Sequence, residues 1–170
     1  MDDKDECCPK FDPSSYTSDD GNKSYKEITW NEKPFVKDGT WCFYYVPLAF
    51  GRAMTRALKK IQNAEAEVEP RSELMVLSDC HSPWYSNIFL SVAEDKEVEG
   101  AEVEKISGTF LAKSFEGDYS NMGKWIKEME TLLKETATKD LKSFYLYYPT
   151  CPKCAKKYGE NYVVIMADVS

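Results

Sequence analysis

The sequence predicts an α+β fold in which a strand-helix-strand-strand module occurs twice, and three observations support this prediction. Apolar and aromatic runs with strand character alternate with two amphipathic helical patterns. The second half repeats the order of the first at an offset of roughly 70 residues. Neither module could cover its own sheet, so we expect one antiparallel sheet with both helices packed on one face, and a ligand cleft between the two modules.

Length and charge limit the possible functions. The chain has 170 residues, with 22 basic and 29 acidic side chains and a formal net charge of −7. This size suits one ordinary domain with its own core, and the acidic balance disfavours nucleic acid as a partner. No apolar run is long enough to span a membrane, and the acidic start is unlike a secretory signal. We therefore expect a cytoplasmic monomer or weak dimer without nucleic-acid or membrane partners.

The chain divides into an arm and a domain. Residues 1–33 are rich in Asp, Ser, Lys and Pro and lack a sustained hydrophobic period, so we expect an N-terminal arm laid over the domain. Residues 34–170 form the single domain, whose two modules cover about 38–94 and 105–170.

The first module begins with a β-branched and aromatic run over 42–46, which predicts a strand that Pro47 and Gly51 end. A helix is expected over about 50–63, and Pro70 separates it from the next strand. The helix is predicted from apolar residues at helical spacing: Met54, Ala57, Leu58 and Ile61. The remaining expected elements are strands over 74–77 and 87–92 and the loop that joins them over 78–86.

The second module comes after an acidic linker over 94–104 and begins with a strand over 105–115. Asp118 or Ser120 can cap the next helix. That helix carries an apolar stripe of Met122, Trp125, Ile126, Met129, Leu132 and Leu133. The remaining expected elements are strands over 143–148 and 162–169, with a loop over 149–161 between them.

Aromatic residues are the strongest signal for a ligand site. Tyrosine has an apolar body and a polar tip, which suits a partly wet pocket, and its ring face attracts cations. Trp84 comes after Pro83 in a loop, where a large apolar ring needs a reason; the alternative is that these rings belong to the core. The candidate ligand-binding residues are Phe43, Tyr45, Trp84, Tyr85, Tyr145, Tyr147 and Tyr158.

Six cysteines raise the question of metal or redox chemistry. Cys151 and Cys154 form a C-x-x-C pair close to basic residues, which would favour a reactive thiolate. A zinc site would need two further ligands, and the candidates are Cys7 or Cys8 from the arm, or Cys80 and His81. We expect no bound metal and no cofactor, and a loop role for Cys151 and Cys154; if a metal is bound, these two are its ligands.

Two carboxylates are candidate catalytic groups. Asp79 and Glu116 each lie near the end of a predicted strand, where either could face a cationic ligand or activate a water molecule. The alternative for Glu116 is an interaction with the dipole of the helix after it. His81, the single histidine, has neighbours in sequence that are poorly placed to form a triad with it.

Several strings resemble a known family. They are Glu6-Cys7-Cys8-Pro9-Lys10-Phe11, Ser82-Pro83-Trp84, Ser107-Gly108-Thr109-Phe110, Phe115-Glu116-Gly117 and Cys151-Pro152-Lys153-Cys154-Ala155-Lys156-Lys157-Tyr158-Gly159. With the doubled module, they resemble a stand-alone branch of the GyrI-like small-molecule-binding, or effector-binding, domains. The resemblance implies an aromatic cleft for flat, often cationic, hydrophobic compounds. Some members are similar to hydrolases that open cyclopropane rings. Many members place a Glu in the closing strand, which this chain lacks over 162–168.

The expected function is therefore binding of planar hydrophobic or cationic small molecules in an aromatic cleft. The main alternative is a hydrolase that opens strained, cyclopropane-type rings in the same cleft. A haem or tetrapyrrole carrier and a zinc or thiol redox protein are further alternatives.

Overall fold

The computed structural model describes residues 11–16, 25–43, 46–47, 49–69, 74–79, 84–94, 96–138, 143–149, 156, 159 and 161–170. The helices of this part are α1 (Phe50–Asn63) and α2 (Met122–Thr136), with short 3₁₀ segments η2 (Pro13–Tyr16) and η4 (Tyr119–Asn121). The strands are β1 (Lys26–Phe43), β2 (Val46–Pro47), β3 (Val76–Asp79), β4 (Tyr85–Ser91), β5 (Glu102–Glu116), β6 (Phe144–Tyr147) and β7 (Tyr162–Asp168). Apart from the two-residue β2, the elements have the expected strand-helix-strand-strand order twice.

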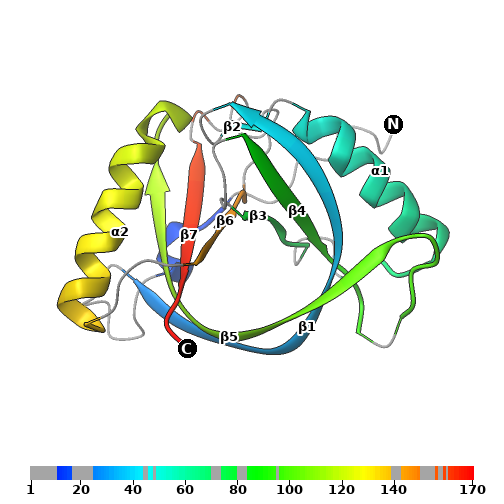
Figure 1. Ribbon diagram of the computed structural model, residues 1–170, viewed down its shortest axis with the longest axis horizontal. Coiled ribbons are helices and arrows are strands. Elements are labelled where there is room, and N and C mark those ends of the chain that lie inside the picture. Colours follow the sequence, from blue (N-terminus) through cyan, green and yellow to red (C-terminus); the bar gives the residue numbers. More distant parts are fainter. Residues whose placement is uncertain are drawn as a thin grey trace.

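The strands form a closed antiparallel barrel. Neighbouring strands run in the order β1-β4-β3-β6-β7-β5, and pairing of β5 with β1 closes the ring. The predicted open sheet with both helices on one face is therefore wrong, because α1 and α2 lie outside the barrel on opposite sides (Figure 1). The long strands β1 and β5 pair from Lys26 with Ala112 to Lys37 with Glu102. Closure gives each of these two strands a second hydrogen-bonded partner and removes the exposed sheet edges.

Each module contributes one half of the barrel. The halves β1-β4-β3 and β5-β7-β6 meet at two seams, β1 with β5 and β3 with β6. Each seam joins equivalent strands in antiparallel fashion, so the halves are related by an approximate twofold axis. Because both seams are hydrogen-bonded ladders, paired strands take the place of the expected cleft between the modules.

Aromatic rings fill much of the barrel interior. Five of them form a closed cycle of ring contacts with centroid separations of 5.2–6.4 Å: Trp30, Phe35, Phe89, Tyr145 and Phe110. Alternation along each strand sends every second side chain inward, which explains why the interior set is spaced by two. The buried members of the interior cluster are Phe35, Leu77, Phe89, Ile106, Phe110, Ala112, Val164 and Met166.

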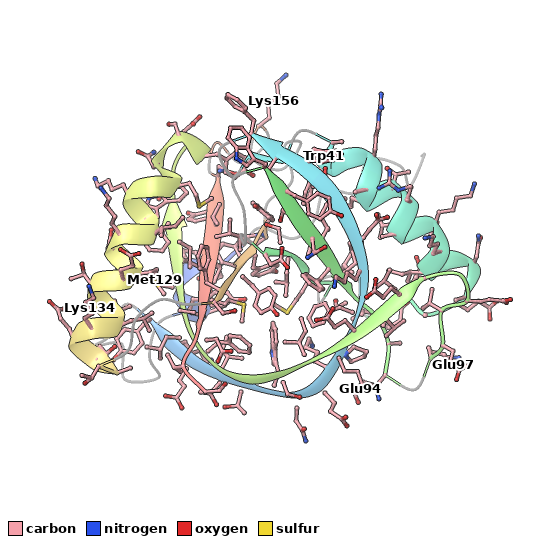
Figure 2. The ribbon with its side chains drawn as sticks, in the orientation of Figure 1. Trp41, Glu94, Glu97, Met129, Lys134 and Lys156 are labelled. Atoms are coloured by element: carbon pink, nitrogen blue, oxygen red, sulfur yellow. The ribbon has the colours of Figure 1, made fainter. Side chains whose placement is uncertain are left out.

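The helices cover the outer surface of the barrel. The helix predicted over 50–63 is confirmed as α1, and it packs Ala53, Ala57 and Ile61 against the outward side chains of β1 and β4. Met129 and Leu133 of α2 pack against β6 and β7, as the position of Met129 shows (Figure 2). No helix in the described part of the chain is long and apolar enough to cross a membrane.

The sheet starts inside the segment expected to be an arm. β1 begins at Lys26, and its first part carries Ile28 and Trp30 into the interior cluster. A bulge between Trp30 and Lys33, with Glu32 at a φ of 49°, interrupts the alternation. Charged residues beside this bulge hide the strand pattern in the sequence. The arm and domain boundary at 33 and 34 thus falls inside one continuous strand.

An ion pair on the outer surface makes stability depend on pH. The Asp38 carboxylate accepts hydrogen bonds from the Arg56 guanidinium at 3.0 and 3.2 Å and from the Gly39 N–H at 2.7 Å. Burial acts to raise the pKa of Asp38, but these donors outweigh it and lower the pKa below its ordinary value of 3.8. A depressed pKa adds stability above the unfolded-state pKa, and this contribution disappears as the pH falls through the folded-state pKa.

We therefore expect Asp38→Asn to lower the melting temperature at pH 7, and the difference from wild type to shrink as the pH falls below about 4. Calorimetry at several pH values measures this difference. Glu97→Gln, on an exposed outer side chain, is the control and should change little at any pH (Figure 2). An Asp38→Asn effect of equal size at pH 7 and at about pH 2 would contradict the assignment.

Candidate functional site

A buried carboxylate lies on the inward face of the barrel near one of its ends. Asp79, the last residue of β3, is 3% exposed. The backbone N–H of Asn87 donates to its Oδ1 at 2.8 Å, and the Asn87 side-chain amide donates to its Oδ2 at 2.9 Å. The Ser86 hydroxyl donates to the backbone carbonyl of Asp79. These contacts from β4 fix the orientation of the carboxylate.

A neutral phenol faces this carboxylate across the β3–β6 seam. Tyr145 is the register partner of Asp79, so both side chains lie on the same face of the sheet. Burial raises the pKa of Tyr145 to about 12, and the charges of Glu104, Asp79 and Asp168 act in the same direction. Tyr145 therefore keeps its proton near neutral pH and can donate a hydrogen bond to an oxygen that gains negative charge.

A lysine completes the polar group. Lys37 lies on β1, and its Nζ is 3.1 Å from a Glu104 carboxylate oxygen and 3.7 Å from one of Glu102. The hydrogen bond to Glu104 raises the pKa of Lys37, and the negative charges of Glu104, Glu102 and Asp79 add to it against the opposing effect of burial. We call Lys37, Asp79, Asn87, Glu104 and Tyr145 the polar end of the barrel.

Exposed aromatic side chains surround the same end. Trp41 is 68% exposed and contacts the ring of Tyr85, which is 43% exposed, edge-on at 5.6 Å; Phe43 and Trp84 make a similar contact at 6.0 Å. Trp41 lies at the far end of β1 (Figure 2). The Tyr85 side chain lies against Gly39, where a Cβ would overlap the tyrosine hydroxyl. Gly39 is also the register partner of Asn87. This aromatic rim, Trp41, Phe43, Trp84 and Tyr85, therefore adjoins the polar end.

The approximate twofold axis relates the residues of the polar end to a different set of residues at the second end of the barrel. The β3–β6 ladder is centred on Ser78 and Leu146, so the axis relates Asp79 to Tyr147. The neighbour of Tyr147 on β7 is Val164, which takes the place that Asn87 has beside Asp79. The symmetry-related position thus has a tyrosine in place of the carboxylate and a valine in place of the asparagine. The residues that fill this second end in contact with Tyr147 and Tyr162 are Phe11 and Tyr16.

The structure brings some of the predicted site residues together and separates others. Asp79 and Tyr145 lie at the polar end, and Phe43, Trp84 and Tyr85 lie on the aromatic rim. Glu116 is exposed at the end of β5, where it pairs with Tyr162 of β7. Tyr145 pairs with Met166, which lies four residues further along β7. Four residues of strand span about 13 Å, so Glu116 lies well away from Asp79. The predicted residues outside the described part of the chain are Tyr45, Tyr158, Cys151, Cys154 and His81.

Sequence reasoning missed Lys37, Asn87, Glu104 and Trp41. Phe35, Lys37, Gly39 and Trp41 recur at every second position, which is the signal that could have placed them on one face of a strand. The pairing of Lys37 with Glu104 had no such signal, because it depends on how β1 and β5 join.

Metal ligands do not gather in the described part of the chain, where no group of three or more His, Cys, Asp or Glu side chains could hold an ion. Cys42, on β1, is a buried free thiol whose pKa is raised by burial. The cysteines considered for zinc or redox chemistry lie outside the described residues, so both alternatives stay predictions.

Comparison with known proteins decides the family. The family model described as bacterial hydrolase matches residues 1–169. The chain belongs to the bacterial hydrolase family. This match corrects the resemblance to GyrI-like domains, because the family that it shows is the bacterial hydrolase family, and the multidrug-binding role implied with that resemblance has no support. The doubled module and several short strings had suggested that family, whereas the match to the bacterial hydrolase model covers residues 1–169. No curated protein matches the sequence.

Solved structures support the fold of this family member. A hydrolase from Listeria innocua superposes with a TM-score of 0.59 at 12% identity, covering 85% of this chain and 91% of that protein. An uncharacterized conserved protein from the same organism gives 0.59 at 11% identity with the same coverage. Identities this low show a common fold alone. Family membership favours the hydrolase alternative over the small-molecule binder that we first expected.

Proposed function

We propose that this protein is a hydrolase that opens strained, electrophilic rings in planar aromatic small molecules at the polar end of the barrel. The observation that carries the proposal is the buried Asp79 carboxylate, held by Asn87 and facing the neutral phenol of Tyr145. Membership of the bacterial hydrolase family supports the reaction class.

The two groups supply complementary proton chemistry. A carboxylate held in a fixed orientation can accept a proton from a water molecule as that water attacks an electrophilic carbon. An ionised carboxylate offers about four acceptor positions, and the contacts with Asn87 use one on each oxygen of Asp79. Tyr145 donates a hydrogen bond to the oxygen that receives the electron pair of the broken bond. One water is added overall, and no covalent intermediate is needed.

The surroundings favour an aromatic substrate. The aromatic rim can contact a planar ring, because aromatic rings attract one another in offset-stacked and edge-to-face arrangements. Carboxylates of Asp79, Glu104 and Asp168 all act on Tyr145, so the negative potential there also favours a substrate with a positive charge. We therefore propose small hydrophobic aromatic compounds, including cationic ones, as ligands.

Product analysis tests this function. The protein is incubated with an aromatic ketone that carries a conjugated cyclopropane, and we expect mass spectrometry to find product heavier than substrate by one water. Quenching of tryptophan fluorescence measures binding in parallel, and Trp41→Ala is expected to weaken binding because its ring is the most exposed of the rim. Saturable binding with no water adduct would reject the hydrolase and leave a binding protein.

A further inference from the structure

The second end of the barrel is covered by rings from a segment that is not part of the barrel wall. Residues 11–16, which include η2, pack the rings of Phe11 and Tyr16 against the interior cluster. The Phe11 ring lies 5.1 Å from the ring of Tyr162, and the Tyr16 ring lies 6.2 Å from that of Tyr147, measured between centroids. Both barrel tyrosines occupy inward-facing positions, on β7 and β6.

These two tyrosines are the symmetry equivalents of residues at the other end. The twofold axis relates Tyr147 to Asp79. It relates Tyr162 to Tyr85, because each is the first residue of the matching seven-residue strand, β7 or β4. The rings of the N-terminal segment therefore cover the positions that correspond to the carboxylate of the polar end and to one ring of the aromatic rim.

Phe11 supplies a ring contact that a barrel strand supplies at the other end. Trp41 of β1 is the register partner of Tyr85, and their rings meet edge-on at 5.6 Å. The matching position on β5 is Glu116, which is exposed and pairs with Tyr162. Since β5 has a carboxylate where β1 has an indole, the ring against Tyr162 comes from Phe11 instead.

The segment lies outside the sheet and is organised by local hydrogen bonds. The Ser15 N–H donates to the Asp12 carbonyl at 3.2 Å, and the Ser14 N–H donates to the Asp12 carboxylate at 3.0 Å. All three of these side chains are exposed, so the segment presents mainly its two rings to the barrel. Segments with few buried apolar contacts open at a lower free energy than the core, so these rings can leave without unfolding of the barrel.

The second end suits an uncharged ring. Ala112 stands at the position on β5 that Lys37 has on β1, and Val164 stands at the position on β7 that Asn87 has on β4. Burial raises the pKa of Tyr16 well above its ordinary value of 10, so its phenol is neutral in this place. A neutral aromatic or phenolic compound therefore matches the chemistry of the rings that lie there now.

We propose that the second end of the barrel is a further binding site, for uncharged aromatic small molecules, and that Phe11 and Tyr16 occupy it as an intramolecular ligand. An external compound binds there when residues 11–16 move out. The two rings belong to the same chain and so have a high effective concentration, with which the compound must compete. The apparent dissociation constant is then the intrinsic one divided by the open fraction. This site is separate from the polar end and does not depend on hydrolysis.

Binding of Nile red, an uncharged planar dye that fluoresces in apolar surroundings, tests the proposal. We expect the double variant Phe11→Ala/Tyr16→Ala of the full chain to bind the dye at least about 10-fold more tightly than wild type, because the two rings no longer compete. The gain should persist when Trp41→Ala is added, since Trp41 lies at the other end. Ser15→Ala, on an exposed side chain of the same segment, is the matched control and should bind as wild type does.

Hydrogen exchange of the wild-type protein tests displacement without any substitution, in case the double variant fails to fold. Dye is added until its fluorescence saturates, and we expect the backbone amides of residues 12–16 to exchange faster than in the free protein. Unchanged exchange over 12–16 would overturn the proposal. Equal affinity of the folded double variant and wild type would also overturn it, as would a gain that disappears with Trp41→Ala, because the dye would then lie on the aromatic rim.

Discussion

Asp79→Asn is expected to lower the rate of ring opening by about 10²–10⁴-fold while binding of the aromatic substrate changes little. Asparagine has the same shape but cannot accept a proton from water, so only the proton-transfer step is removed. In wild type both oxygens of Asp79 accept hydrogen bonds from Asn87, whereas the new asparagine side chain has one acceptor oxygen. Thermal melting is therefore measured as well, to confirm that the variant folds. The loss should appear in kcat rather than in the dissociation constant measured by fluorescence.

Glu116→Gln is the matched control for this prediction, because Glu116 was the other carboxylate candidate from the sequence. It is exposed at the end of β5, about 13 Å along the sheet from the polar end, so its loss should leave turnover unchanged. Full activity in Asp79→Asn together with a large loss in Glu116→Gln would transfer the role of base to Glu116 and move the site to the opposite end of the barrel.

Phe35→Ala is expected to lower the free energy of unfolding by about 3–5 kcal/mol. The Phe35 ring is fully buried and contacts both Trp30 and Phe89 in the cycle of interior aromatics. The cycle is built on four strands of a closed barrel, so its neighbours cannot move together to fill the space left by the ring. Urea denaturation monitored by circular dichroism measures the change.

The control for stability is Phe43→Ala on the same strand. Phe43 is 56% exposed, so removing its ring should change stability by less than about 1 kcal/mol. Equal losses from the two variants would show that the interior ring cycle does not form the core of the barrel.

Local patterns in the sequence predicted most elements well. The apolar stripe from Met54 to Ile61 predicted α1 with its observed bounds. The Asp118 carboxylate accepts a hydrogen bond from the Ser120 N–H at the start of the second helical region, as expected of a cap. The strand expected over 105–115 is the central part of β5. These features depend on neighbours within a few residues, which is the information that periodicity carries.

The candidate site was predictable only in part. Asp79 and Tyr145 were each identified from residue type and from position in or at the end of a strand, and their roles stay predictions. Their juxtaposition depends on the pairing of β3 with β6, two strands from different modules. Lys37 lies at the polar end for a similar reason, since Glu104 reaches it only through the β1–β5 seam.

By itself, the sequence determined the order of the elements, the doubled plan of the chain and the approximate bounds of both helices and of β3 to β7, but it missed most of β1. Only the tertiary structure decided that the sheet closes and that α1 and α2 lie on opposite sides of it. The physical reason is that alternation of period two assigns residues to two faces of a strand and is the same for an open sheet and for a barrel wall. Closure is decided by long-range pairing of β1 with β5 and of β3 with β6, and the same pairing brings Lys37 to Glu104 and Asp79 to Tyr145.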